Sequence, residues 1–83
     1  MNAKELPQPW QDVITKLGDG QRLVETLSEW ATFEDGTRVY CDDLALMAEE
    51  GIVDYEPDPH DAREAVFFLT EEGEALRQEL VTV

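Results

Sequence analysis

The 83-residue sequence predicts a small α+β domain of the winged helix-turn-helix class, with three helices, a two-stranded wing and a C-terminal helix. Two patterns support this class. Apolar residues recur at helical spacing through the first half of the chain. Two strand-like runs around a proline-rich turn then precede a last helical segment. No stretch is long enough to serve as a linker, so residues 1–83 are expected to form one domain with residues 1–7 as a loose lead-in.

The first half of the chain predicts two helices separated by glycines. Pro9 suits the first turn of a helix, and its apolar stripe would hold Trp10, Val13, Ile14 and Leu17. Gly18-Asp19-Gly20 interrupts this pattern, and Asp19 is a candidate N-cap for a second helix. The stripe of that helix would hold Leu23, Val24, Leu27 and Trp30. Both tryptophans are expected to anchor the core.

A third helix is expected within residues 37–50, where Tyr40, Leu44 and Met47 share one helical face and Gly51 suits the end. Residues 37–40 leave two possibilities open, a short strand or the first turn of this helix. In the helix-turn-helix fold this third helix would be the one that reads DNA.

The second half of the chain predicts a β-hairpin followed by a helix. Residues 52–56 and 65–69 have strand composition, and residues 57–59 form a turn. Thr70 is a candidate cap for the last helix, because a threonine hydroxyl can accept from the first free backbone N–H groups. Glu71 and Glu72 suit the positive end of its dipole, and Leu76 and Leu80 would face the core.

The charge balance excludes several partners. Twenty acidic residues oppose six basic ones, which gives a formal net charge of −14. Such a chain is not expected to bind duplex DNA or an anionic membrane surface directly, since both need clustered cations. The sequence has no apolar run of membrane-spanning length and no signal-peptide core, and its one cysteine cannot form an internal disulfide. We therefore expect a cytoplasmic protein, in the host cytoplasm if it is phage-encoded.

Residues 51–76 resemble the wing of the MarR family of winged-helix regulators. The matching positions are the start at Gly51-Ile52-Val53, the tip at Asp58-Pro59-His60-Asp61-Ala62-Arg63, and the helix start at Leu69-Thr70-Glu71-Glu72-Gly73. The resemblance implies a winged helix that binds DNA, and it assigns DNA contacts to Arg38 and Arg63. Tyr55, Ala62 and Ala65 stand where the family commonly has arginine or lysine. The other interpretation of Arg63 is an ion pair with Asp61 that stabilises the wing.

No pattern in the sequence points to catalysis, a metal or a cofactor. His60 is the only histidine and lies in a proline-flanked turn, where a solvated side chain is expected. Cys41 has no histidine close in sequence to activate it, and adjacent carboxylates such as Asp42 and Asp43 diverge on a helix. We therefore predict that the protein is not an enzyme and requires no cofactor.

The sequence thus favours an acidic winged-helix module that binds a basic nucleic-acid-binding protein or complex, as a monomer or small homodimer. A phage-type inhibitor that mimics DNA, such as an anti-CRISPR or anti-restriction protein, fits this description. The predicted binding face combines the third helix and the wing; its residues are Asp42, Asp43, Glu49, Glu50, Asp54, Tyr55, Glu56, Asp58 and Asp61. The alternative is a MarR-like transcriptional regulator from a salt-adapted organism, and a weaker third option is an assembly module in a larger complex.

Overall fold

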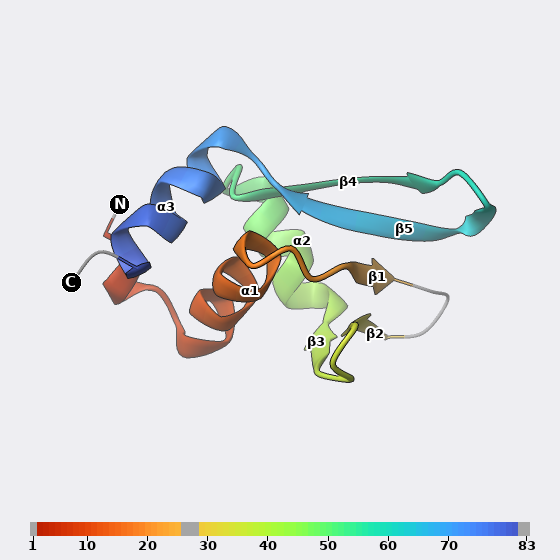
Figure 1. Ribbon diagram of the computed structural model, residues 1–83, viewed down its shortest axis with the longest axis horizontal. Coiled ribbons are helices and arrows are strands. Elements are labelled where there is room, and N and C mark those ends of the chain that lie inside the picture. Colours follow the sequence, from red (N-terminus) through yellow and green to blue (C-terminus); the bar gives the residue numbers. More distant parts are fainter. Residues whose placement is uncertain (1, 26–28, 82–83) are drawn as a thin grey trace.

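The computed structural model describes residues 2–25 and 29–81. Within them the chain forms a five-stranded antiparallel sheet and three α-helices (Figure 1). The elements in chain order are the 3₁₀ turn Ala3–Glu5, α1 (Gln8–Gly18), β1 (Leu23–Glu25), β2 (Trp30–Phe33), β3 (Arg38–Tyr40), α2 (Cys41–Glu49), β4 (Val53–Asp58), β5 (Asp61–Leu69) and α3 (Glu71–Val81).

The sheet has the strand order β3-β2-β1-β5-β4, and the helices cover one of its two faces. Side chains on the covered face are buried against the helices; they include Leu23, Ala31, Phe33, Val39 and Phe67. Val13 and Ile14 of α1, Leu44 and Met47 of α2 and Leu76 of α3 complete this core. The alternate residues of the same strands point to the open face, where Trp30, Tyr40 and Phe68 are 39%, 39% and 41% exposed.

The β4–β5 hairpin is the longest feature of the molecule and projects beyond the helices (Figure 1). Its register runs from Val53 opposite Leu69 to Asp58 opposite Asp61, with an irregularity between Pro57 and Asp58. The projecting hairpin is consistent with the elongated shape, whose extents are 38 × 22 × 21 Å.

The predicted helix-turn-helix is wrong. The segment expected to form the second helix instead supplies β1 and β2, which pair with each other and join β5 to the edge strand β3. Leu27 of the expected stripe lies outside the described residues. A hairpin within residues 52–69 does form, as predicted, but its strands are longer than expected and its turn lies at 59–60, not 57–59. The hairpin belongs to a five-stranded sheet and is not a separate two-stranded wing.

Tertiary pairing explains the error. The run Val66-Phe67-Phe68 in β5 is apolar on both faces, and a free-standing hairpin would leave much of it in water. Pairing of Leu23 with Phe67 places both side chains in the core beneath the helices. The β-branched and aromatic residues of β1 and β2 suit this sheet, so non-local burial overrides the local helical spacing. The ambiguous segment 37–40 is accordingly a strand, and it runs directly into α2.

The predicted end of α2 and the predicted cap of α3 are confirmed, whereas the predicted N-cap at Asp19 is wrong. Gly51 has a φ of 78° and follows Glu50, the C-cap of α2. Its N–H donates to the carbonyl of Ala48, and that of Ile52 donates to the carbonyl of Met47, which is a Schellman ending. At α3, the Thr70 hydroxyl accepts from the N–H of Gly73 at 3.1 Å, so Thr70 is the predicted cap. Asp19, expected to start a helix, instead ends α1.

The two tryptophans have different surroundings. Trp10 packs against the core as expected, whereas Trp30 lies on the open face and meets Tyr40 edge to face at 4.7 Å. The lead-in is partly ordered, because Ala3 is fully buried and its N–H donates to Glu79 at 3.4 Å. Within residues 2–25 and 29–81, no helix has the length and apolar character needed to cross a bilayer.

Candidate interaction site

Helix α2 and its C-cap Glu50 carry four of the predicted binding residues, which lie on two different sides of the helix. Asp42, Ala45 and Glu49 are exposed and lie at i, i+3 and i+7, on one stripe. Asp43 and the C-cap Glu50 lie seven residues apart, on a side of the helix about 100° from that stripe, and Asp43 borders a separate groove next to α1. Asp42 and Asp43 also occupy the first turn, where a carboxylate is favoured by the helix dipole.

The predicted residues of β4 likewise lie on two different faces, because successive side chains of a strand point to opposite sides of the sheet. Tyr55 pairs with Phe67 and the two rings meet at 5.5 Å, so Tyr55 lies on the sheet face that carries the helices. It remains 57% exposed because the hairpin extends past the helices. Asp54 and Glu56 alternate with Tyr55 and therefore point to the open face, beside Phe68 and Val66. The predicted face is thus not one continuous surface.

An apolar groove of about 250 Å³ lies between α2 and the hairpin. Its lining residues are Glu25, Cys41, Leu44, Ala45, Ala48, Tyr55 and Phe67. We call it the α2–hairpin groove. Ala45 lines the groove, so the stripe that it shares with Asp42 and Glu49 runs along the side of the groove formed by α2. Glu25 of β1 also lines the groove and contributes a carboxylate. The structure therefore brings together Asp42, Glu49 and Tyr55 of the predicted set.

Glu25, Ala45 and Phe67 were not among the predicted site residues. Glu25 was not predicted as a site residue because the sequence pattern assigned it to a helix, whereas it lies in β1 opposite Ala65. Phe67 lies within an apolar run that indicated only a buried strand. The exposed alanine Ala45 carries no chemical signal in the sequence, so only the fold identifies its position in the groove.

Cys41 lies in the α2–hairpin groove as a protonated thiol. Burial is the main cause that raises its pKa to about 11, and the hydrogen bond and negative charge of Glu25 raise it further. A thiol with that pKa is a poor nucleophile at neutral pH, because the thiolate is the reactive form. Cys41 is half-buried, as the sequence predicted. Elsewhere in the described residues, no three histidine, cysteine or acidic side chains gather to hold a metal ion.

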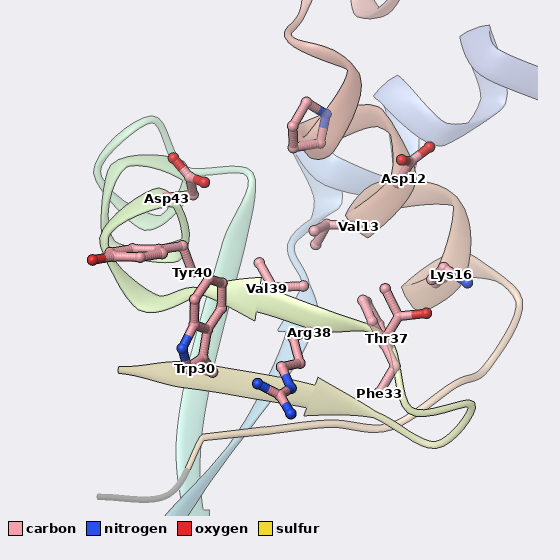
Figure 2. A pocket seen from close by; sticks show the side chains of 11 residues that line it. Asp12, Val13, Lys16, Trp30, Phe33, Thr37, Arg38, Val39, Tyr40 and Asp43 are labelled. Atoms are coloured by element: carbon pink, nitrogen blue, oxygen red, sulfur yellow. The ribbon is translucent and has the colours of Figure 1, made fainter. Parts of the chain in front are cut away.

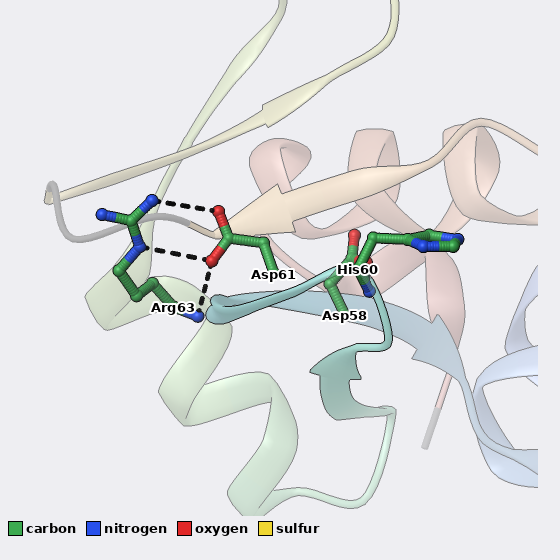
Figure 3. Close-up of polar contacts among 4 residues, drawn as sticks. All are labelled: Asp58, His60, Asp61 and Arg63. Carbon is green, nitrogen blue, oxygen red and sulfur yellow. Dashed lines mark hydrogen bonds and ion pairs between the residues drawn. The ribbon is translucent and has the colours of Figure 1, made fainter.

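The tip of the hairpin holds the remaining predicted residues (Figure 3). Asp61 accepts from the backbone N–H of Arg63 at 3.0 Å and from its guanidinium at 3.3 and 3.4 Å. These bonds hold the pKa of Asp61 below its usual range. The interpretation of Arg63 as the partner of Asp61 is confirmed, and the guanidinium is already engaged by a carboxylate.

Asp58 differs from the other predicted carboxylates because it is buried. Its residue is 7% exposed, and its carboxylate forms an ion pair with Arg22 and accepts from the His60 N–H at 2.7 Å. Asp58 therefore stabilises the base of the hairpin turn and cannot meet a partner. The side chain of His60 is exposed, as the sequence predicted (Figure 3).

Internal ion pairs engage most of the cations. Besides the pairs of Arg22 and Arg63, Lys16 pairs with Asp35 at 2.5 Å and Arg77 with Asp19 at 3.5 Å. In the described part of the chain, Lys4 and Arg38 are the basic residues outside ion pairs. Asp42 and Glu49 form no ion pair there either, so their charges face solvent uncompensated.

Comparisons of the chain with protein-family models, with curated proteins and with solved structures found no match.

Proposed function

We propose that the protein is an acidic interaction module that uses the α2–hairpin groove to bind arginine or lysine side chains on a nucleic-acid-binding surface of a partner. The observation that carries this proposal is the coincidence of an apolar groove, an exposed tyrosine and uncompensated carboxylates in one place. A partner whose nucleic-acid-binding cations are occupied in this way loses its nucleic acid. The module is then an inhibitor, as an anti-CRISPR or anti-restriction protein would be.

The chemistry of the groove supports a long cationic side chain as the ligand. Ala45, Ala48 and Phe67 offer apolar surface for a methylene stem. Glu25 within the groove, and Asp42 and Glu49 along its helical side, offer carboxylates for the charged end. The ring of Tyr55 can add a cation–π contact. Charge around the groove speeds the encounter, and the apolar floor and the tyrosine supply most of the affinity.

The test adds the purified protein to a panel of CRISPR effectors and restriction endonucleases and measures their DNA binding and cleavage. We expect inhibition of at least one member. Tyr55→Ala should weaken this inhibition by about thirtyfold, because truncating a central aromatic anchor typically costs about 2 kcal/mol. Asp42→Lys combined with Glu49→Lys should weaken it further and reduce its salt dependence.

The matched control combines Glu71→Lys with Glu74→Lys on α3, where both side chains are exposed. It changes the net charge by the same amount as the α2 double variant but leaves the groove intact. An equal loss in the two double variants would mean that bulk charge, and not the groove, determines binding. A panel in which every enzyme remains fully active would contradict the inhibitor function.

A further inference from the structure

The edge strand β3 presents unused backbone hydrogen-bonding groups. The N–H of Phe33 donates to the carbonyl of Thr37, and that of Cys41 donates to the carbonyl of Glu29, both at 2.9 Å. In an antiparallel pair these bonds recur at every second residue. Residues 37, 39 and 41 therefore point their backbone groups toward β2. Arg38 points its N–H and carbonyl away from the sheet, and Tyr40 points its N–H away, because the carbonyl of Tyr40, the N-cap of α2, serves that helix. Among the described residues, neither of these two N–H groups has an acceptor.

The opposite edge of the sheet, formed by β4, is protected against pairing with a further strand. The Thr70 N–H donates to the carbonyl of Ile52, so the same alternation directs the backbone groups of Val53, Tyr55 and Pro57 outward along β4. The Tyr55 N–H is occupied by the Asp54 carboxylate at 2.8 Å, and Pro57 has no N–H. The irregularity after Pro57 interrupts the strand further. Charges, prolines and bulges of this kind are the usual protection of an edge strand against pairing.

The free edge of β3 opens into a groove of about 340 Å³ between α1 and α2 (Figure 2). Val13 of α1, Phe33 of β2 and Val39 of β3 give it an apolar base, and Pro9 and Asp12 extend the wall on the α1 side. A helix facing an edge strand across a groove is the arrangement in which PDZ and PTB domains add an extended peptide to their sheets. We call this the β3-edge groove; it is separate from the α2–hairpin groove.

The charges of the β3-edge groove favour a cationic occupant. Asp12 on α1 and Asp43 on α2 line it, and among the described residues neither forms an ion pair. Lys16 also lines it, but its charge is compensated by Asp35 at 2.5 Å. Arg38 lines it as well and forms no ion pair among the described residues, so the uncompensated carboxylates exceed the uncompensated cations by one. The net charge of −14 disfavours a second copy of this chain as the occupant, since like charges would be brought together.

We propose that the β3-edge groove binds an extended basic segment of a partner protein as an additional strand beside β3. The backbone of that segment pairs with Arg38 and Tyr40. One apolar side chain enters between Val13 and Val39, and neighbouring lysine or arginine side chains reach Asp12 and Asp43. This site is independent of the function proposed for the α2–hairpin groove.

A pair of variants at one residue isolates the backbone contact. Tyr40 has φ −68° and ψ 130°, which proline adopts without strain. Tyr40→Pro removes the outward N–H, while Tyr40→Ala retains it, and both lose the ring contact with Trp30. The probe is a short synthetic peptide in which lysine and valine alternate, with a fluorescent label for anisotropy.

The Tyr40 ring lines the groove, so we expect both variants to lose its contact with the peptide equally. Tyr40→Pro should bind the peptide about five- to tenfold more weakly than Tyr40→Ala, the usual effect of one lost hydrogen bond. In amide NMR spectra, the peptide should slow exchange of the Arg38 and Tyr40 N–H groups. Equal affinity of the proline and alanine variants, or peptide-induced protection along β4 instead of β3, would overturn the proposal.

Two further experiments test the charge preference of the groove and the self-association of the protein. Asp12→Lys combined with Asp43→Lys should abolish the preference for the lysine–valine peptide over its glutamate–valine counterpart, and an unchanged preference would contradict the proposed contacts. Sedimentation of the protein alone should show a species independent of concentration. A dimer that Tyr40→Pro dissociates and Tyr40→Ala does not would identify a second copy as the occupant and overturn the proposal.

Discussion

Two aspartates of the hairpin turn show how strongly the role of a residue depends on the fold. Asp58 and Asp61 are both acidic residues of one turn, and the sequence assigned both to a solvent-facing surface. Asp58 is buried and paired with Arg22, which lies 36 positions earlier in the chain. Asp61 is paired with Arg63, two positions later. The local pair was predictable from sequence spacing, and the distant one required knowledge of how β1 approaches the hairpin.

Asp58→Asn should destabilise the protein by about 1–3 kcal/mol, since hydrogen bonds to charged groups contribute about that much. The exposed half of Arg22 remains solvated, so the loss stays below that of a fully buried ion pair. Denaturant unfolding followed by circular dichroism measures the change. Asp61→Asn is the control and should have little effect, because that pair is exposed. Equal stability of both variants would contradict the structural role of Asp58.

Cys41 should react slowly with alkylating reagents at neutral pH. Because burial and Glu25 raise its pKa to about 11, the thiolate is scarce below that pH. The rate of modification by iodoacetamide, followed by mass spectrometry, should keep rising well above pH 9 in the folded state. The raised pKa also stabilises the folded protein below the unfolded value of 9.0, and this contribution is lost as the pH rises through 11. Rapid modification at pH 7 would contradict this assignment.

At the scale of elements, the correct predictions are those in which a local signal specifies the structure. Helix α1, the ending of α2 at Gly51 and the cap of α3 at Thr70 all depend on contacts within a few residues. Strands β1 and β2 contain only three and four residues. Strand β1 depends on β5 as an apolar partner, and β2 in turn pairs with β1 and β3. The α2–hairpin groove could not be predicted either, because its position depends on a non-local feature, the direction of the hairpin relative to α2.

Gly73→Ala should destabilise the protein by about 1–3 kcal/mol, although alanine is normally the better helix former. A Cβ at this position would lie 2.2 Å from the carbonyl oxygen of Ile52, so α3 would have to move away from the start of β4. Ala75→Gly, at an exposed site of the same helix, is the comparison and should cost about 1 kcal/mol through helix propensity alone. A Gly73→Ala variant that is more stable than wild type would show that α3 can shift freely.

Glu49 should lower the stability of the fold, although it contributes to the binding proposed for the α2–hairpin groove. It occupies the last turn of α2, where a carboxylate meets the negative end of the helix dipole and no basic residue compensates it. Glu49→Lys should therefore stabilise the fold by about 0.3–1 kcal/mol. The same change should weaken inhibition of the partner. Melting curves and the inhibition assay on one preparation measure both effects, and a variant that is less stable than wild type would contradict the dipole argument.

For the molecule as a whole, the distribution of charge matters more than its total. Ion pairs engage Lys16, Arg22, Arg63 and Arg77, all with carboxylates of the same chain. Unpaired carboxylates are spread over the exposed surface of the described residues, and some of them, such as Asp12, Asp42 and Glu49, lie at the two grooves where the surface is concave. Acidity alone would confer solubility, so the proposed interaction depends on the two concave surfaces beside these carboxylates and not on the total charge.

The isolated protein should not bind duplex DNA at physiological salt. A protein that contacts DNA well neutralises roughly six to ten phosphates, whereas Lys4 and Arg38 are the cations outside ion pairs in the described residues. They lie on different elements, and Arg63 would have to break its bonds to Asp61 before it could reach a phosphate. Fluorescence anisotropy with a labelled duplex at about 150 mM salt should show no saturable binding. A sub-micromolar dissociation constant that rises with salt would instead require a cationic surface that the observed ion pairs do not leave available.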